Sequence, residues 1–381
     1  MTATVEHAVP FFAPDLFEAD RDVLLELLYE VGTCPDQKFI LGGRTACFEE
    51  ALRAETRAAD AVACSSGTSA LTLILAAMGI GPGDEVVVPA FGCAPLASTV
   101  LASGARPVFA DIDPVRLTMD PAGAEALVTE RTRALMPAHM FSVMADMPRL
   151  RDVADRAGLR LVEDSALAQG GALEGRPAGL WGDAGVHSFV QVKVFGMPGE
   201  GGVVLTDDTE LGERVRMLRN HGQDGRNRFL HHHVGHNSRF DEVMAAFQLH
   251  RMAGLPARVA RRTEICSYYS ERLGDLADAG ITAPGVGGDG RFPYVYTLLC
   301  EDRDGLRAHL EAEGITTHVY YPRILPDQPA FAPHASPDGH WPQAREAARL
   351  NISLPLYPHL TDAQVERVAD NVRAFARRRT G

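Results

Sequence analysis

The strongest constraint on the fold is a regular alternation of short β-rich segments with helical patterns between residues 60 and about 210. Strands that alternate with helices predict a mainly parallel sheet covered by helices on both faces. Continuous apolar runs such as Val86–Val88 and Leu161–Val162 are typical of strands that are buried on both sides. We therefore expect an α/β domain built on one central sheet.

Seven strands are expected in this domain. They are Ala61–Cys64, Glu85–Pro89, Arg106–Asp111, Ala134–His139, Leu159–Glu163, Gly185–Phe189 and Gly202–Thr206. The 3.6-residue periodicity of the segments between and after them predicts helices. These include Pro95–Ser103, Ala122–Thr129, Met147–Ala157, Glu210–Arg219 and Arg239–Met252.

A second, smaller domain is expected after a long spine helix, Pro256–Leu273. Beyond a glycine-rich turn, Gly285–Gly290, short strands alternate with helices, which is typical of an α+β domain. The strands are Tyr294–Leu299, Thr316–Tyr321 and Asn351–Leu354, and the helices are Arg303–Glu313 and Asp362–Arg378. We therefore divide the 381 residues into a large domain over 1–250, N-terminal segment included, and a small domain over 251–381.

The charge and the apolar segments restrict the partners. The formal net charge of −13 argues against nucleic acid, whose phosphates select basic surfaces. Met1–Asp20 lacks the basic and apolar regions of a signal peptide, and the longest apolar stretch, Ala70–Ile80, is too short to cross a bilayer. The six cysteines have no CxxC spacing, as expected for free thiols in a reducing compartment. We expect a cytoplasmic protein that binds neither nucleic acid nor membrane.

The turn Ser65–Ser69 lies between a predicted strand and a predicted helix. Hydroxyl groups and free amides at a helix N-terminus bind phosphate, and glycine lets the phosphate approach closely. Ordinary capping of the helix by serine explains the same residues. By itself the turn therefore leaves both interpretations open.

Asp164 follows an apolar strand, at the strand end where open α/β sheets bind ligands. A desolvated carboxylate needs a cationic partner, and a pyridinium nitrogen is a fitting one. The alternative is an aspartate that caps a helix.

Lys193 follows another apolar strand and precedes the turn Gly199–Gly202. Of the 37 basic residues, only Lys38 and Lys193 are lysines. An amine can become neutral and attack a carbonyl, whereas a guanidinium stays charged, so a lysine that survives in an arginine-rich chain is a candidate nucleophile. The alternative is compositional drift. The glycines do not have G-x-G-x-x-G spacing, which excludes a dinucleotide fingerprint.

Taken together and in order, these motifs resemble the StrS/DegT-type sugar aminotransferases, a branch of the fold-type-I pyridoxal-phosphate enzymes. The resemblance covers nearly the whole chain. The matching segments are Ser66–Leu71, Gly81–Val86, Glu163–Asp164, Ser188–Lys193, Gly199–Gly202, Leu218–Gly222, Asn237–Glu242 and Ser353–Pro355.

The resemblance implies a cofactor, pyridoxal 5′-phosphate, and a role for each matching residue. Lys193 is implied to hold the cofactor as a Schiff base and to move the proton, and Asp164 to pair with the pyridine nitrogen. The residues implied to surround the cofactor are Ser66, Gly67, Thr68 and Ser188 at the phosphate, Cys93 and Leu167 at the ring, and Asn237 at the phosphate of a partner subunit. His139 and Arg239 are implied, more loosely, to lie near the substrate.

Three positions depart from the family pattern. Cys93 stands where an aromatic ring usually stacks on the cofactor, so that ring support is lost. Leu167 replaces a Gln or His near the phenolic oxygen and can donate no hydrogen bond. Val190–Val192 replaces a proline-containing approach to the lysine.

The first functional hypothesis is a homodimeric aminotransferase with sites at the subunit interface. It moves an amino group from glutamate or glutamine to a keto-sugar, nucleotide-linked or not, or to a cyclitol ketone, in secondary-metabolite or surface-sugar biosynthesis. The departures at Cys93 and Leu167 motivate an alternative, elimination, racemisation or carbon–carbon chemistry on the same fold. A regulatory homologue without activity is a third possibility, which predicts loss of Lys193 or Asp164. Both residues are present.

The three consecutive histidines His231–His233 raise the question of a metal site. Consecutive side chains cannot share one face of a helix or strand, and no Cys or Asp partner lies at ligand spacing. We expect no metal here, and interpret the segment as a loop near the subunit interface.

Overall fold

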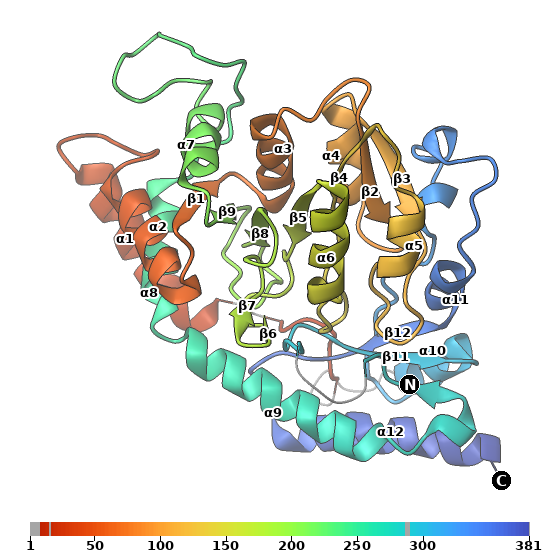
Figure 1. Ribbon diagram of the computed structural model, residues 1–381. Coiled ribbons are helices and arrows are strands. Elements are labelled where there is room, and N and C mark those ends of the chain that lie inside the picture. The colour runs from red at the N-terminus through yellow and green to blue at the C-terminus, as the bar shows by residue number, and fades with distance from the viewer. Residues whose placement is uncertain (1–7, 15–16, 286–289, 381) are drawn as a thin grey trace.

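The computed structural model describes residues 8–14, 17–285 and 290–380 of the chain (Figure 1). A seven-stranded sheet with the order β1-β9-β8-β5-β4-β2-β3 forms its centre. The strands are β1 (Asp60–Cys64), β2 (Glu85–Pro89), β3 (Arg106–Ala110), β4 (Thr132–Leu135), β5 (Arg160–Asp164), β8 (Ala184–Ser188) and β9 (Gly202–Thr206). Only β9 runs against its neighbours, β1 and β8. The expected mainly parallel seven-stranded sheet is thus confirmed.

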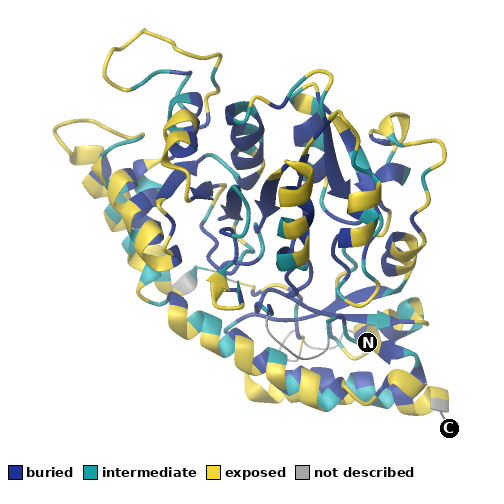
Figure 2. Ribbon diagram, in the orientation of Figure 1, coloured by how far each residue is buried: buried dark blue, intermediate teal, exposed yellow. Residues whose placement is uncertain are grey.

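Helices cover the sheet, and its strands are buried between their inner faces (Figure 2). The helices of this part are α1 (Arg21–Thr33), α2 (Gly43–Thr56), α3 (Gly67–Ala77), α4 (Pro95–Ala102), α5 (Pro121–Ala126), α6 (Met147–Ala157), α7 (Thr209–Leu218) and α8 (Glu242–Met252). Helix α6 shows why they form where they do. The Asp146 side chain accepts a hydrogen bond from the Arg149 amide at its start, and Gly158, with a φ of 64°, ends it in the left-handed conformation.

The spine helix α9 (Leu255–Leu273) leads from the large sheet into the C-terminal part and lies beside α12 (Asp362–Thr380) along one edge of the molecule (Figure 1). A three-stranded antiparallel sheet follows, β10 (Ile281–Thr282), β11 (Tyr296–Cys300) and β12 (Asn351–Leu354), with helices α10 (Arg303–Ala312) and α11 (Pro342–Leu350). A two-stranded hairpin, β6 (Ala172–Leu173) and β7 (Arg176–Pro177), stands apart from both sheets. No helix in the described part of the chain is both long and apolar enough to span a membrane.

The predicted strand Thr316–Tyr321 is wrong. Only an isolated bridge, between His318 and Ser353, occurs there. Tyr321 adopts a φ of 53°, outside the β region, so the extended conformation ends there. Residues 286–289 of the predicted turn Gly285–Gly290 lie outside the described residues.

Two hydrophobic cores hold the molecule together. One surrounds the large sheet and the other lies between α9, α10, α12 and the small sheet. Two segments cross between them: Val9 packs in the second core, whereas Ile324 and Trp341 pack in the first. A single cut at residue 250 does not separate these cores cleanly, and the domain boundary stays a prediction.

Glu242, at the start of α8, fixes the beginning of α2. Its buried carboxylate accepts hydrogen bonds from the amides of Gly42 (2.7 Å), Arg44 (2.9 Å) and Thr45 (2.9 Å). Burial alone would raise the pKa of Glu242, but the hydrogen bonds from Thr45, Arg44 and Gly42 outweigh it and hold the pKa below its usual value of 4.5. One ionised side chain thus satisfies amides that the helix itself cannot.

We predict that Glu242→Gln lowers the free energy of unfolding at pH 7 by about 1.5–3 kcal/mol, because bonds to a charged acceptor are lost. Since the folded pKa is depressed, the difference from wild type is complete above the unfolded pKa and shrinks as the pH falls through the folded pKa. Chemical denaturation at several pH values measures it. Glu30→Gln, which removes an exposed partner of Arg44, is the control and should change stability by less than about 0.5 kcal/mol. Equal effects of the two variants would contradict the prediction.

Candidate active site

Asp164 and Lys193 come together at the carboxyl edge of the large sheet. Asp164 is the last residue of β5, which pairs in parallel with β8, and Lys193 lies in the turn that follows β8. Hydrogen bonds from the Lys193 amide to Val190 O (2.9 Å) and from the Gly196 amide to Lys193 O (3.0 Å) shape this turn. The charge of Lys193 acts on the Asp164 carboxylate. The sheet therefore places both predicted residues in one site.

The Asp164 carboxylate is buried with few partners. It accepts a hydrogen bond from the Ala166 amide (3.2 Å), and the Cys93 thiol lies 3.6 Å away. Burial raises the pKa of Asp164, and the Ala166 amide, the Lys193 charge and the Cys93 thiol offset this only in part. Among the described residues no ion pair neutralises it. Such a carboxylate is suited to a cationic ligand group.

Glu163 and His139 are hydrogen-bonded to each other next to Asp164, and the His139 amide donates to the Asp164 carbonyl. The predicted strand Ala134–His139 ends early, at Leu135, but a bridge between Ala138 and Asp164 continues the alignment. The Ala145 amide donates to His139 Nδ1 (3.1 Å), so we assign the proton to Nε2, which donates to Glu163 (3.0 Å). Burial would raise the pKa of Glu163, but His139, the Gly179 amide and Ser165 lower it overall.

The predicted substrate role of His139 stays a prediction. Its ring is buried, and both of its nitrogens are engaged inside the protein.

The turn before α3 has the geometry of an anion site. The Ser66 side chain caps α3 by accepting from the Ser69 amide (3.0 Å), and the first amides of a helix have no intrahelical acceptor. A Cβ atom at Gly67 would lie 3.0 Å from the Ser188 Cβ, so the turn and the end of β8 approach each other closely and a larger residue at 67 would crowd Ser188. Gly67 and Ser188 thus lie side by side, with Thr68 next along α3, and their role at a phosphate stays a prediction.

The C-terminal part contributes aromatic residues that the sequence motifs did not reveal. Lys193 Nζ lies 4.9 Å from the centre of the Tyr294 ring. Tyr321 is partly buried near Cys93 and Asp164, and its ring meets Phe91 edge-on at 5.8 Å. Burial is the main cause that raises the pKa of Tyr321. The sequence signal for Tyr321 is the pair Tyr320–Tyr321 before Pro322, which the β-rich composition instead predicts to be a strand.

The two residues that depart from the family pattern at the ring lie in different environments: Cys93 is next to Asp164, and Leu167 packs against the large core. Burial, and then the negative charge of Asp164, raise the pKa of the Cys93 thiol well above its ordinary value. Leu167 is half-buried and packs against the large core.

Asn237 and Arg239 lie on an exposed segment that leaves α7 and returns to α8 (Figure 1). The Arg239 Nε donates to Asn237 Oδ1 (3.0 Å). Between them Ser238 lies 3.0 Å from Ser65, oxygen to oxygen, so the segment returns to the phosphate turn. The structure therefore does not place their side chains with Asp164 and Lys193 of the same chain, whereas it does bring their backbone close to α3.

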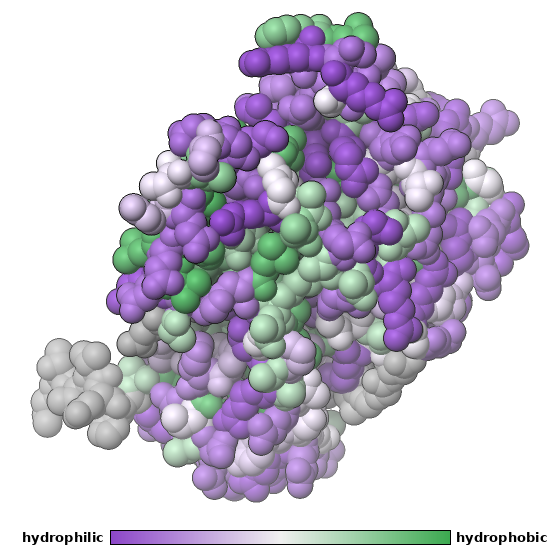
Figure 3. Space-filling view, turned by 90° about the vertical axis from the view of Figure 1, so that its left-hand side faces the viewer, coloured by the Kyte–Doolittle hydropathy of each residue, from purple (hydrophilic) through white to green (hydrophobic). Residues whose placement is uncertain are grey.

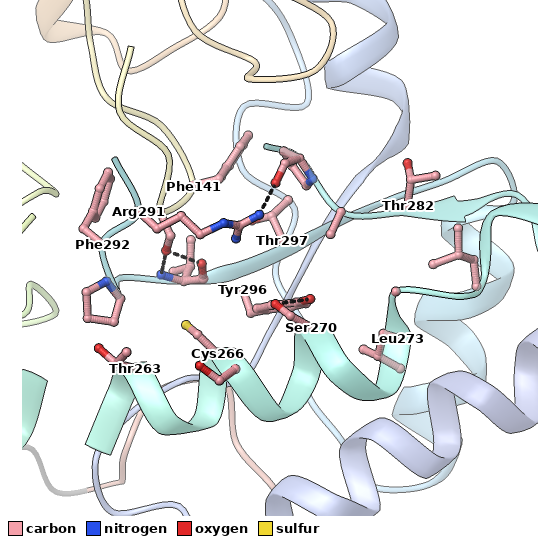
Figure 4. Close-up of a pocket in the computed structure, with 18 of the residues that line it drawn as sticks. Phe141, Thr263, Cys266, Ser270, Leu273, Thr282, Arg291, Phe292, Tyr296 and Thr297 are labelled. Atoms are coloured by element: carbon pink, nitrogen blue, oxygen red, sulfur yellow. Dashed lines mark hydrogen bonds between the residues drawn. The ribbon is translucent and has the colours of Figure 1, made fainter. Parts of the chain in front are cut away.

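A separate apolar cavity of about 520 Å³ lies between α9, β11 and the loop at Phe141 (Figure 4). Phe292, Val295 and Tyr296 line it, and Arg291 donates to Pro284 O (2.9 Å) at its rim. Asp164 and Lys193 do not line it. It is thus distinct from the predicted site.

These residues fit pyridoxal 5′-phosphate. Lys193 is an amine at the sheet edge, and the buried Asp164 carboxylate supplies the negative charge that a protonated pyridine nitrogen requires. The start of α3, with Gly67, offers an anion site for the phosphate. The fold and site define a fold-type-I pyridoxal-phosphate-dependent transferase. The chain belongs to the DegT/DnrJ/EryC1/StrS aminotransferase family, whose model matches residues 27–373. It is therefore an aminotransferase with pyridoxal 5′-phosphate as cofactor, which favours the first functional hypothesis.

Known relatives are similar over almost their full length. The chain is 39% identical to the dTDP-3-amino-3,4,6-trideoxy-alpha-D-glucose transaminase of Streptomyces venezuelae, covering 97% of each chain. It is 37% identical to the pleiotropic regulatory protein of Geobacillus stearothermophilus, covering 94% of this chain and 97% of the relative. The crystal structure of S. venezuelae DesV in complex with a ketimine intermediate superposes with a TM-score of 0.90 at 40% identity, covering 97% of this chain and 98% of the other.

We predict that Cys93 reacts slowly with iodoacetamide because its buried thiol stays protonated beside Asp164. At pH 8 its labelling, followed by peptide mass spectrometry, should be more than about tenfold slower than that of the exposed Cys34 in the same sample. Asp164→Asn removes the repelling charge and should speed the labelling of Cys93 but not of Cys34. Similar rates for the two cysteines in the wild-type protein would contradict the prediction.

Proposed function

We propose that Lys193 binds the aldehyde of pyridoxal 5′-phosphate covalently and that Asp164 pairs with the pyridine nitrogen. The observation that carries the proposal is the Asp164 carboxylate, which is buried without an ion-pair partner in the described structure and feels the charge of Lys193. A pyridinium nitrogen supplies the missing positive charge. In return, the carboxylate keeps that nitrogen protonated.

The other residues of the site are proposed to bind the phosphate and to transfer the proton. The amides at the start of α3, with Ser66, Gly67, Thr68 and Ser188, are proposed to bind the phosphate. When bound, the cofactor supplies an electron sink for the carbon that carries the amino group. Lys193 is proposed to take the proton from that carbon and to return it one position further on, which an amine near a ring edge can do and an arginine cannot.

The proposed reaction moves an amino group from glutamate or glutamine to a keto-sugar linked to a nucleotide, in secondary-metabolite or surface-sugar biosynthesis. The name of the S. venezuelae relative, a dTDP-amino-sugar transaminase, supports the acceptor class. The choice of glutamate or glutamine as the amino donor is based on the resemblance to the sugar aminotransferase family.

A homodimer with shared sites is proposed as the working form. One side of the molecule exposes large apolar side chains, on α1 and on the segment between α7 and α8 (Figure 3). They include Leu25, Leu28, Tyr29, Phe229 and Val234. Figure 3 shows them as separate patches with hydrophilic surface between them, and exposed apolar patches are one mark of an interface. Asn237 and Arg239 lie on the same segment, and we propose that Asn237 reaches the phosphate of a partner's cofactor.

We predict that borohydride reduction of the purified holoenzyme fixes the cofactor on Lys193. Mass spectrometry should find the label in the tryptic peptide 161–214, because a modified lysine resists cleavage and trypsin does not cut the Arg176–Pro177 bond. Lys193→Arg should lose the label and lower kcat by about 10²–10⁴-fold, since the proton-transfer group is gone. Lys38→Arg, at the other lysine, is the matched control and should leave both unchanged. A label that persists in Lys193→Arg would refute the anchor, and no pyridoxamine form with any amino acid would refute the transamination.

Hybrid dimers test the shared site. Asn237→Ala should weaken cofactor binding by about 10- to 100-fold, because a hydrogen bond to a charged group is lost. A dimer of one Lys193→Arg chain and one Asn237→Ala chain, purified with two different tags, then contains one intact site if Asn237 acts across the interface. We expect about half of the wild-type activity from it at limiting cofactor. Activity no higher than that of the Asn237→Ala homodimer would place Asn237 in its own chain's site.

A further inference from the structure

Two consecutive residues near the site, Phe141 and Ser142, adopt positive φ angles of 48° and 79°. Side chains other than glycine are disfavoured in this region, so surrounding interactions must hold the loop there. Strained backbone of this kind is concentrated at functional sites. The contacts of Ser142 show what the conformation achieves.

The buried Ser142 hydroxyl is fully used by the segment that opens the C-terminal sheet. It accepts hydrogen bonds from the amides of Tyr294 (3.0 Å) and Val295 (3.1 Å) and donates to Val295 O (2.6 Å). A hydroxyl has one proton to donate and two lone pairs, so this set saturates it. The Ser142 side chain, in a loop of the large domain, therefore binds the main chain of both Tyr294 and Val295.

The same peptide units carry the ring that lies over Lys193. The Tyr294 side chain is buried, with the Lys193 Nζ 4.9 Å from its ring centre. From the other direction, Arg262 of α9 donates to Tyr294 O (3.1 Å). The Tyr294 main chain is thus fixed by hydrogen bonds to two different elements.

Packing alone does not fix this segment. Phe292, Val295 and Tyr296 line the apolar cavity of about 520 Å³, which leaves the segment with a hollow beside it (Figure 4). A wall that faces a hollow lacks the close contacts that position most core residues. The hydrogen bonds of Ser142 and Arg262 fix the Tyr294 main chain beside this hollow, and its ring packs in the large core.

We propose that Ser142 is a positioning residue that sets the Tyr294 ring over the amino nitrogen of Lys193, where the ring stabilises positive charge on that nitrogen. This rests on the proposed role of Lys193 as the cofactor anchor. An aromatic face attracts a cation within about 6 Å of its centre, more strongly where water is excluded.

The test is the pH midpoint of the visible absorption of the bound cofactor, a property of the holoenzyme that does not depend on turnover. Because the ring favours the protonated form, Tyr294→Leu should lower the midpoint by about 0.5–1 pH unit. Tyr294→Phe keeps the ring and should stay near wild type. The other titratable groups around the site, Asp164, Cys93, His139, Tyr320, Tyr321 and Arg262, remain in all variants.

Ser142→Gly removes the hydroxyl while it relieves the backbone strain, so it should fold and should lower the midpoint in the same direction as Tyr294→Leu. Ser142→Ala removes the hydroxyl alone and serves as the second variant. Tyr296→Leu and Thr297→Val are matched controls, because they remove a ring bonded to Ser270 and a hydroxyl bonded to Ser353 from the same segment. They should lower the melting temperature and leave the midpoint unchanged.

An unchanged midpoint in Tyr294→Leu, or an equal shift in Tyr296→Leu, would overturn the role of the ring. A wild-type midpoint in both Ser142 variants would overturn the positioning role of Ser142. Borohydride labelling of the wild-type protein separates these results from a failure of the proposed function. A label away from Lys193 contradicts the anchor, whereas a label on Lys193 with an unchanged Tyr294→Leu midpoint contradicts only the present proposal.

Discussion

A carboxylate buried without a cation is the constraint around which the site is arranged. Asp164 ends β5, where strand order places it beside the turn of Lys193, and its charge is offset only in part by an amide, a thiol and the lysine. The residue before it, Glu163, is also buried, but His139, Ser165 and the amides of Gly179 and Trp181 satisfy it. Glu163 is thus a structural carboxylate whose hydrogen bonds are satisfied within the protein, whereas Asp164 requires a ligand.

The sequence was informative where one local pattern decides the structure. Apolar runs such as Val86–Val88 predicted buried strands, and the order of the motifs predicted the meeting of Asp164 with Lys193. Strand Thr316–Tyr321 was mispredicted because its β-rich composition does not show that Tyr321 turns to a φ of 53°. Tyr294 was missed for another reason. Its position depends on Ser142, which is 152 residues away, and no spacing rule connects the two.

The departures from the family pattern gain a physical meaning in the structure. Cys93 lies against Asp164 rather than supplying a ring, and Tyr294 and Tyr321 bring aromatic faces from the C-terminal part. The C-terminal part therefore contributes residues beside Cys93 and Lys193 as well as the second core. The roles of the single residues, the donor and the dimer stay predictions.

The one antiparallel strand of the large sheet has a consequence for how the protein is made. Strand β9 lies between β1 and β8, and it pairs Gly202 with both Cys64 and Ser188. The ends of β1 and β8 are therefore paired through a strand that is synthesised about 140 residues after β1. Pairings of such long range form slowly. The sheet around the site can consequently be completed only after β9 has been synthesised and has paired with both neighbours.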